Sequence, residues 1–411
     1  MSNKSNTNEK FKETEICLIP DDWKVLKLGD ICEIRGGKRL PKGSDFSPDK
    51  TSHPYLRIVD FALNGIKKEN LQYIDDEIFS KIKNYIIRSG DLYISIVGSI
   101  GLIGIVENDL DNASLTENAA RLICSKNINN KFLLYYLRSQ DCQDQINANS
   151  VGAVQKKLPI YGIKNLNIPL PSLSEQQKIA EVLGAMDDKI ELNRKMNKSL
   201  ESLGQAIFNE SFCHSKQSKE FLRPLSEFGT IVCGKTPSKS NNSYFNGEIP
   251  FIKIPDMHGQ TFILKTEDSL TIVGKDSQSD KTIPTGSICV SCIATVGLVS
   301  ITTKDSQTNQ QINSIIPAKK EYEFYLYFIL SNLNQDLKNM ASGGSATLNL
   351  NTGSFSKIEI YKPSEELLTI FDTQARPIFD QILNNAKEIE TLSQIRDSLL
   401  PRLMSGKLRV E

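Results

Sequence analysis

The pattern of apolar and polar residues predicts two folded segments, each followed by a long helix. From about residue 23 to residue 171, short apolar runs of strand length alternate with glycine, asparagine and proline, as at Tyr55–Val59 and Leu92–Val97. A helical stretch at Lys131–Leu137 lies among them and is echoed at Phe324–Leu330. This mixture predicts an α+β domain built around a twisted, partly antiparallel sheet.

The spacing of apolar residues then changes to alternating steps of three and four. Ser174 followed by Gln177 indicates a capping box at the start of a helix. The seam that follows comprises Ile179, Leu183, Met186, Ile190, Asn193, Asn197, Leu200, Gly204 and Ile207. This spacing predicts a heptad helix over about 175–211, with a seam that is polar near its middle.

A second seam lies near the end of the chain. It comprises Phe371, Ala375, Ile378, Ile382, Asn385, Ile389, Leu392, Arg396, Leu399 and Leu403. It predicts a helix over about 367–403, which Pro377 should kink or restart. Each seam is also typical of one side of a compact helical bundle. About five unbroken heptads favour a coiled coil instead, in which the two helices run antiparallel as a strut between two globular heads.

One asparagine lies near the midpoint of each predicted helix. Asn193 and Asn385 occupy the same heptad class, and in an antiparallel pair only residues near the midpoints face their own equivalents. We therefore expect the two amides to hydrogen-bond to each other and to fix the coiled-coil register. The alternative is that both amides face solvent or a partner subunit at a loosely packed waist.

The two halves of the chain repeat each other. Pro54–Asp60 returns as Pro250–Asp256, and Gly98–Gly101 returns as Ala294–Gly297, each offset by about 196 residues. Such an internal pseudo-two-fold repeat suits a protein that reads a target in two halves or grips two copies of one partner. The predicted boundaries are a flexible N-terminal tail over residues 1–19, a first domain over 20–170, a helical spacer over 171–212, a linker over 213–223, a second domain over 224–362, and a distal helix with a C-terminal tail over 363–411.

Composition narrows the class of protein. The chain carries 49 basic and 49 acidic side chains, so bulk charge alone would not hold nucleic acid. Its start lacks the apolar core of a signal peptide, and no apolar run reaches about 18 residues, which predicts a cytoplasmic protein without membrane contact. Cys289 and Cys292 have the spacing of metal ligands, but their counterparts are Tyr93 and Ile96, which favours buried structural cysteines.

The sequence contains no recognisable catalytic motif. It lacks the phosphate-binding Gly-x-x-x-x-Gly-Lys-Ser/Thr loop, the Asn-Pro-Pro-aromatic motif of amino-methyltransferases and the Gly-x-Ser-x-Gly elbow. The glycine-rich run Gly98–Gly104 keeps only Gly297 in the second half, which favours a turn within the sheet. One alternative, a duplicated α+β enzyme, would need convergent titratable residues that neither half offers.

Polar loops that contain glycine remain as candidates for binding, at equivalent places in both halves. They run over 35–43 and over 234–239, with a further candidate at Gln155–Lys157 that aligns with Thr347–Asn349. Lysine, arginine, serine and threonine are the usual donors to DNA phosphates and base edges. The predicted DNA-binding residues are Arg35, Lys38, Arg39, Lys42, Arg57, Lys156, Lys157, Lys235, Thr236, Ser238, Lys239 and Lys253. Any one such loop is more typical of a solvated surface, and a coiled-coil adaptor with two protein-binding heads is an alternative function.

Four segments carry a resemblance to a known family. In chain order they are Ile19–Trp23 leading to Leu28–Asp30, Pro169–Ile179, Gly234–Ser238 leading to Tyr244–Pro250, and Leu399–Leu408. Together with the repeat, they resemble the specificity subunit of type I restriction–modification systems over nearly the whole chain. The second copy of Pro169–Ile179 departs from the pattern, because it has no Glu-Gln-Gln at the positions that correspond to Glu175, Gln176 and Gln177. The contacts that these three residues make are therefore expected only once in the chain.

The resemblance implies that each head is a target recognition domain for one half of a bipartite double-stranded DNA site with a non-specific gap. The helices would hold the heads apart and dock two methyltransferase subunits. With those subunits the complex would methylate adenine, and with motor-nuclease subunits it would also cleave unmethylated DNA. The chain itself would be a non-catalytic subunit that binds no cofactor, since S-adenosylmethionine, ATP and magnesium would belong to its partners.

Overall fold

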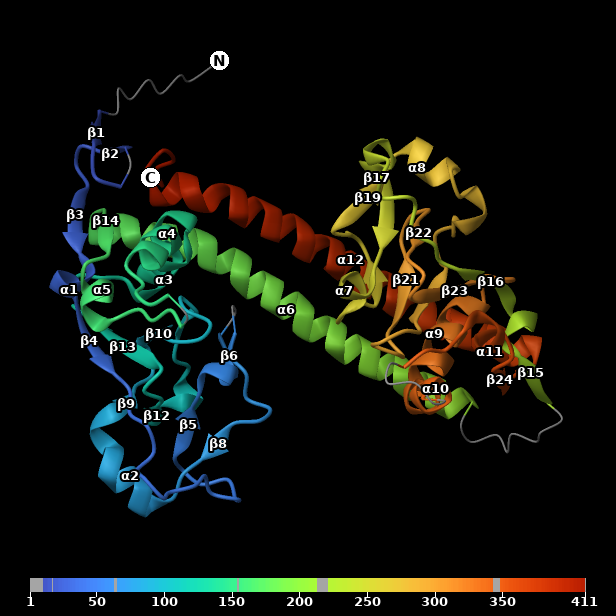
Figure 1. Cartoon of the computed structure of the whole chain (residues 1–411), viewed down its shortest axis with the longest axis horizontal. Helices are drawn as coiled ribbons and strands as arrows, with labels where there is room; N and C mark the ends of the chain where they lie inside the picture. Colours follow the sequence, from blue (N-terminus) through green and yellow to red (C-terminus); the bar gives the residue numbers. More distant parts are fainter. Residues whose placement is uncertain are drawn as a thin grey trace. The chain divides into compact units, whose positions relative to one another are not determined.

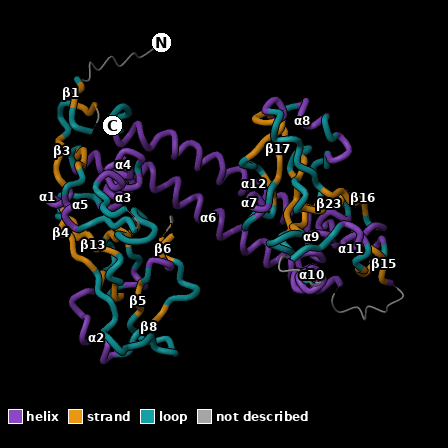
Figure 2. The backbone as a smooth tube through the Cα atoms, viewed as in Figure 1, coloured by secondary structure: helices purple, strands orange, loops and turns teal. Residues whose placement is uncertain are grey.

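The chain folds into two compact units, each of which mixes helices and strands (Figures 1 and 2). The structure is a computed structural model that describes residues 10–16, 18–62, 65–153, 155–212, 221–342 and 348–410. The first unit comprises Met1–Asp188 with Leu392–Glu411, and the second comprises Lys189–Thr391. The predicted linker lies outside the described residues over 213–220.

The first unit contains a four-stranded antiparallel sheet and a smaller mixed one. The first sheet has the order β11-β10-β13-β4, with β4 at Cys32–Gly36, β10 at Leu92–Ser95, β11 at Ile103–Ile105 and β13 at Ala119–Cys124. The second has the order β8-β5-β12-β9, with β5 at Pro54–Leu56, β8 at Gln72–Tyr73, β9 at Ile86–Ile87 and β12 at Ala113–Leu115. A further pair joins β3 (Lys24–Lys27) to β14 (Asn167–Leu170).

Helices α3 (Asn130–Arg138) and α4 (Gln140–Ala148) share a hydrophobic core with the first sheet. Helix α3 begins where the side chain of Asn129 accepts a hydrogen bond from the backbone N–H of Phe132. Phe132 and Leu133 are fully buried and belong to one core with Leu92 and Leu122 of the sheet. The alternating strands and the apolar face of α3 therefore bury each other, as the sequence pattern predicts.

The second unit repeats this plan. Its main sheet has the order β16-β23-β20-β21-β18, with β16 at Gly229–Cys233, β18 at Phe262–Ile263, β20 at Ile288–Ser291, β21 at Val299–Thr302 and β23 at Ile312–Pro317. A smaller sheet has the order β19-β17-β22, with β17 at Phe245–Ile252, β19 at Asp268–Leu270 and β22 at Gln307–Thr308, and β15 (Leu222–Pro224) pairs with β24 (Glu359–Tyr361). Helix α9 (Tyr322–Asn332) corresponds to α3. The matching strand order confirms the internal repeat and the α+β class.

Both long helices are present and each has 40 residues. Helix α6 spans Leu173–Phe212 and helix α12 spans Glu365–Met404. The predicted capping box at Ser174 is wrong, because the side chain of Ser172 accepts the hydrogen bond, from the backbone of Glu175. Ser172 directly precedes the first helical residue and is therefore the N-cap. Ser364 likewise caps α12, because its side chain accepts a hydrogen bond from the backbone N–H of Leu367.

Within each unit the two helices run antiparallel. In the second unit Asn193 contacts Glu388 and Asn197 contacts Asn385, so contacts move backward along α12 as they move forward along α6. In the first unit Asp187 pairs with Arg396 at 2.7 Å. Every predicted seam residue is buried or half-buried, which confirms the seams. Pro377 is exposed and α12 continues through it, so the helix does not restart there.

The predicted hydrogen bond between Asn193 and Asn385 is wrong. Both residues are buried, but Nδ2 of Asn193 donates to Glu388 at 2.8 Å and Nδ2 of Asn385 donates to Oδ1 of Asn197 at 2.8 Å. The physical reason is register: the local two-fold relation between the helices falls between Asn193 and Asn197 rather than at Asn193. Burial also rules out the alternative in which both amides face solvent.

The beginning of the chain is more ordered than the predicted tail. Strand β1 (Phe11–Glu13) pairs antiparallel with β2 (Leu18–Pro20), and the ammonium of Lys12 donates to the backbone carbonyls of Asp21 and Trp23. The expectation of a flexible tail is therefore wrong for this hairpin, while residues 1–9 lie outside the described part of the chain.

The cysteine pair is structural. Cys289 and Cys292 are buried, and burial raises the pKa of Cys289 to about 12. No group of three or more His, Cys, Asp or Glu side chains within the described residues could hold a metal ion. Among the same residues, no helix combines the length and apolar character that crossing a membrane requires.

Candidate nucleic-acid interface

Four connections of the first unit meet at one end of its main sheet. Gly36 at the end of β4 is paired with Ala120 at the start of β13, which is paired with Ile94 near the end of β10. The segment around Lys157 joins the same edge, because Lys157 forms a bridge with Val97. We call residues 36–42, 96–102, 116–118 and 155–157 the first loop end.

The second unit builds an equivalent surface. Cys233 is paired with Asn313, and Ser291 with Ile312, so β16 and β20 end where β23 begins. Asn349 forms a bridge with Ile293, just as Lys157 does with Val97, which confirms the predicted alignment of Lys157 with Asn349. We call residues 233–239, 292–298, 309–311 and 348–349 the second loop end; Thr347, aligned with Gln155, lies outside the described residues.

A glycine followed by a lysine crosses between the two sheets in each unit. The backbone N–H of Lys38 donates to the carbonyl of Leu115, and that of Lys235 donates to the carbonyl of Thr308. A Cβ on Gly37 would overlap the carbonyl oxygens of Leu115 and Thr116. A Cβ on Gly234 would likewise overlap the carbonyl oxygens of Thr308 and Asn309. Only glycine allows this close approach, and it sets both lysines at matching places.

Several predicted DNA-binding lysines are exposed at these loop ends. They are Lys38, Lys42, Lys156 and Lys157 in the first unit, and Lys235 and Lys239 in the second. Within the described part of the chain none of them forms an ion pair. The ammonium of Lys38 lies 5.5 Å from the ring centroid of Tyr85. Exposed cations without a carboxylate partner are suited to neutralising phosphates.

Arg39 of the first loop end and Arg35, which precedes it in β4, form ion pairs instead. Nε of Arg35 lies 2.8 Å from Glu33, and Nε of Arg39 lies 2.7 Å from Glu117. Partial burial opposes ionisation of Glu117, but the hydrogen bonds that it accepts, from Arg39 above all, and the positive charge of Arg39 together outweigh burial and hold the pKa of that carboxyl below its usual value. Glu117 is therefore a carboxylate at neutral pH, set among basic side chains.

Two other predicted DNA-binding residues serve within the fold. Arg57 makes a two-pronged ion pair with the buried Asp60 and also donates to the backbone carbonyl of Asn70. Its counterpart Lys253 pairs with Asp268. Both residues precede short helical turns that Asp60 and Asp256 cap by accepting backbone hydrogen bonds. A DNA contact by Arg57 or Lys253 stays a prediction.

The second loop end carries hydroxyl and amide groups. Oγ1 of Thr236 donates to Oε1 of Gln310 at 2.7 Å, and the hydroxyls of Ser238 and Ser240 lie 2.8 Å apart. The sequence analysis missed Glu117 and Gln310, because both follow short strands in connections that contain neither glycine nor a basic residue. The amide-rich run Thr308–Gln311 is the signal that could have found Gln310.

The glycine-rich run of the first unit is a turn within the sheet, as predicted. Gly98 and Gly101 have φ angles of 78° and 82°, and the turn joins β10 to β11. In the second unit Gly297 keeps this conformation, and Ala294, the counterpart of Gly98, is held at a φ of 63°. The turn is thus kept although one glycine is lost, which fits a structural role in both loop ends.

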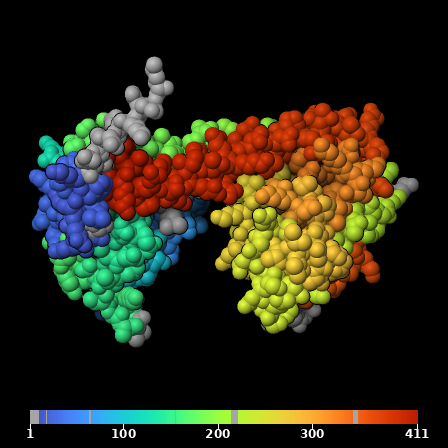
Figure 3. All heavy atoms as spheres, turned by 90° about the horizontal axis from the view of Figure 1, so that it is seen from above, coloured from blue at the N-terminus to red at the C-terminus, as the bar shows by residue number. Residues whose placement is uncertain are grey.

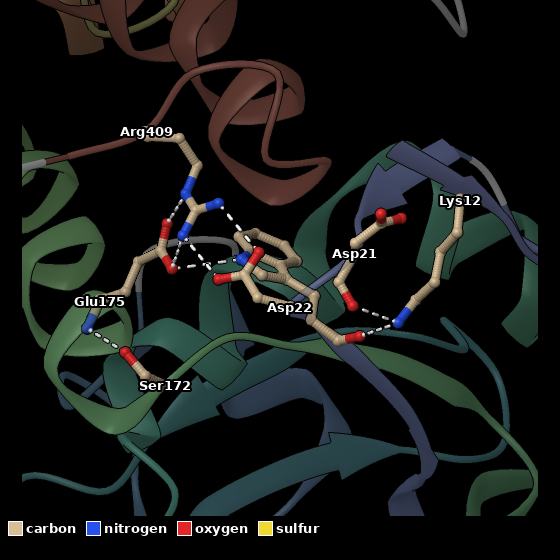
Figure 4. Close-up of polar contacts among 7 residues, drawn as sticks. Lys12, Asp21, Asp22, Ser172, Glu175 and Arg409 are labelled. Atoms are coloured by element: carbon tan, nitrogen blue, oxygen red, sulfur yellow. Dashed lines mark hydrogen bonds and ion pairs between the residues drawn. The ribbon is translucent and has the colours of Figure 1, made fainter. Parts of the chain in front are cut away.

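Away from the loop ends, a polar cluster fastens the C-terminal segment to the first unit (Figure 4). Arg409 donates to the buried Glu175 at 2.5 and 2.9 Å and to Asp22 at 2.9 and 3.1 Å. Glu175 also accepts from the indole of Trp23 at 3.2 Å. These contacts occur once, as predicted, because the second copy has Leu367 at the position of Glu175.

Comparison with known proteins assigns the family. A family model described as the type I restriction modification DNA specificity domain matches residues 20–202 and again residues 220–396. The HindI type I restriction enzyme specificity subunit of Haemophilus influenzae is 35% identical, with 94% of this chain and 100% of that protein covered. The MjaIX specificity subunit of Methanocaldococcus jannaschii is 26% identical, with 98% and 97% covered. The S subunit of a type I system from M. genitalium has a similar fold, with a TM-score of 0.62 at 18% identity over 97% of this chain and 99% of that one.

Proposed function

The chain belongs to the family of type I restriction–modification DNA specificity subunits, and we propose that each of its two loop ends reads one half of a bipartite DNA target. The observation that carries this proposal is the duplicated glycine–lysine crossover, which presents a lysine at matching places in both units. The framework is the same in both units, while the exposed side chains around the lysine differ. Two equivalent surfaces with different side chains would bind two different DNA sequences.

We propose further that this chain directs the chemistry of other subunits. Two methyltransferase subunits would methylate adenine at the chosen site, and motor-nuclease subunits would add cleavage of unmethylated DNA. S-adenosylmethionine, ATP and magnesium would bind to those subunits, and the assembly would act in the cytoplasm, where the DNA is. The lysines of both loop ends would add to the phosphate contacts that the partners make.

The long helices offer a surface on which such partners could dock. Leu192, Met196 and Leu203 of α6 are exposed by 53%, 38% and 50%, and Ile395 of α12 by 41%. Figure 3 shows that α12, in red, leaves one side of its length uncovered. Large exposed apolar side chains on a helix are typical of a protein–protein contact. Leu192→Asp with Met196→Asp should abolish copurification with the methyltransferase, whereas Ser202→Asp, at an exposed position about a quarter-turn away around α6, should not.

The test of bipartite reading is a domain exchange. Residues 224–362 would be replaced by the matching segment of another family member with a different known target. Sequencing of methylated DNA from cells that carry the exchanged subunit and its methyltransferase should show one new half-site, with the other half-site and the gap unchanged. A change in both half-sites would show that the units do not read independently.

A further inference from the structure

The two loop ends place one bonded pair of polar side chains at equivalent positions. In the first, Nε of Arg39 donates to Glu117 at 2.7 Å; in the second, Oγ1 of Thr236 donates to Oε1 of Gln310 at 2.7 Å. Arg39 and Thr236 each directly follow the crossover lysine. Each partner lies in the connection that leads into the inner strand next to the edge of the main sheet, β13 or β23.

Backbone hydrogen bonds establish that these positions correspond. Gly37 donates to the carbonyl of Ala119, and Gly234 donates to the carbonyl of Ile312. Counting back two residues from each acceptor gives Glu117 in the first unit and Gln310 in the second. The same site is therefore occupied by a charged pair in one unit and by a neutral pair in the other.

The exposure of these pairs argues against a role in stability. The side chain of Arg39 is 80% exposed and that of Glu117 is 30% exposed, and exposed ion pairs add little to folding free energy. A carboxylate among exposed lysines would also weaken a purely electrostatic contact with DNA phosphates. Its use is to orient the arginine, since only Nε of Arg39 is bonded to Glu117 and the two terminal nitrogens have no hydrogen-bond or ion-pair partner within the described residues.

The chemistry of each pair matches a particular base pair. An arginine presents two parallel N–H donors to O6 and N7 of guanine, which is the commonest specific contact in the major groove. Glutamine instead donates to N7 and accepts from N6 of adenine. The bond from Thr236 to Oε1 fixes which end of the Gln310 amide is the donor, and it leaves Nε2 available.

We infer that this pair is a specificity determinant, so that Arg39 with Glu117 selects a G·C base pair in one half-site and Gln310 with Thr236 selects an A·T base pair in the other. The inference rests on the proposed function, because it assumes that the loop ends face DNA. It goes further in naming one position per unit, the residues that read it and the base pair each prefers.

The experiment exchanges the two chemistries between units. The double variant Arg39→Thr with Glu117→Gln gives the first unit the pair of the second, and Thr236→Arg with Gln310→Glu does the reverse. Each variant would be assembled with its methyltransferase and a randomised DNA library, and the bound sequences would be compared with those of the wild type. The matched control is Glu107→Gln, which removes a carboxylate from the exposed Lys68–Glu107 pair at the opposite end of the first unit's main sheet.

The inference expects one position to change in each variant. The first double variant should lose its preference for G·C by about 5- to 150-fold and gain one for A·T at one position of one half-site, and the second should do the reverse in the other half-site. Glu107→Gln should leave the target unchanged. An unchanged target, or an equal loss of affinity for all sequences, would overturn the inference although the wild type still selects a bipartite site. A wild type that selects no bipartite site would overturn the proposed function itself.

Single substitutions keep the inference testable if a double variant fails to fold. The single changes Glu117→Gln and Gln310→Ala alter only one exposed or half-exposed side chain. Each should relax the same single position that its double variant changes. Relaxation at a different position, or at none, would contradict the assignment.

Discussion

Nδ2 of Asn385 donates to Oδ1 of Asn197 across the helix pair at 2.8 Å, whereas the equivalent amide, that of Asn193, donates to Glu388. Oδ1 of Asn193 has no hydrogen-bond partner within the described residues. The two asparagines are thus both buried but not equally satisfied, and their replacement should have opposite effects.

Asn193→Leu should stabilise the protein. It removes a buried amide oxygen without a partner, so the free energy of unfolding should rise by about 1 kcal/mol. Asn385→Leu should instead lower it by a similar amount, because it leaves Oδ1 of the half-buried Asn197 without its donor. Denaturant titration would measure both, with the exposed Asn384→Leu as a control that changes little. Equal effects at Asn193 and Asn385 would show that the unpaired oxygen is not what distinguishes them.

Gly37→Ala should disrupt the first loop end alone. Its Cβ would overlap the carbonyls of Leu115 and Thr116, so the crossover that sets Lys38 and Arg39 has to move. We expect the variant to lose recognition of one half-site and to keep the other. Selection of bound sequences from a DNA library would measure this.

The neighbouring glycine provides the control for that variant. A Cβ on Gly36 would meet nothing within 4 Å, so Gly36→Ala should bind like the wild type. If both variants lose the half-site, the close approach at Gly37 is not the cause. Gly234→Ala should show the mirror result in the second unit.

Lys38 and Lys235 should each contribute one phosphate contact. Replacing either with alanine should weaken binding of the complex to all DNA sequences and flatten the slope of log affinity against log salt by about 0.9. Binding titrations at several salt concentrations would measure the slope. Lys126→Ala and Lys320→Ala remove exposed lysines that follow the far ends of β13 and β23, and they should leave the slope unchanged. A loss confined to one base position would instead assign a base contact.

Arg409→Ala should release the C-terminal segment from the first unit. The carboxylate of Glu175 is buried and would keep only the indole of Trp23 as a donor within the described residues, so we expect a loss of about 2–3 kcal/mol. Hydrogen exchange over residues 400–410 should accelerate. Lys407→Ala, an exposed neighbour, is the matched control and should leave exchange unchanged.

The same cluster should respond to acid. The hydrogen bond from Arg409 holds the pKa of Asp22 below its ordinary value of 3.8 in the folded chain. The contribution of the Asp22–Arg409 pair to folding stability is therefore present at neutral pH. It is lost as the pH falls below about 3.8 and through the lower pKa that Asp22 has in the folded chain. Acid unfolding of the wild type should contain this step, and Arg409→Ala should lack it. An identical acid transition in both would exclude Asp22 as its source.

The sequence by itself determined the repeat, the α+β class and the two heptad helices. Each of these depends on a periodicity that the chain carries locally, such as the steps of three and four that lead to Ile190 and Ile382. It also identified Lys38 and Lys235 as equivalents, because a glycine precedes each at a matching distance from repeated segments.

Only the tertiary structure decided which side chains meet. The antiparallel register is shifted by three to four residues from the one in which Asn193 would face Asn385, so Asn385 meets Asn197 and Asn193 meets Glu388. No local pattern encodes that shift. Likewise, Arg39 pairs with Glu117, 78 positions away, whereas Arg57 pairs with the buried Asp60, only three positions away, so spacing in the chain does not reveal which arginine is exposed. Pairing across strands and helices depends on the packing of the whole unit, because each contact is fixed by residues distant in sequence.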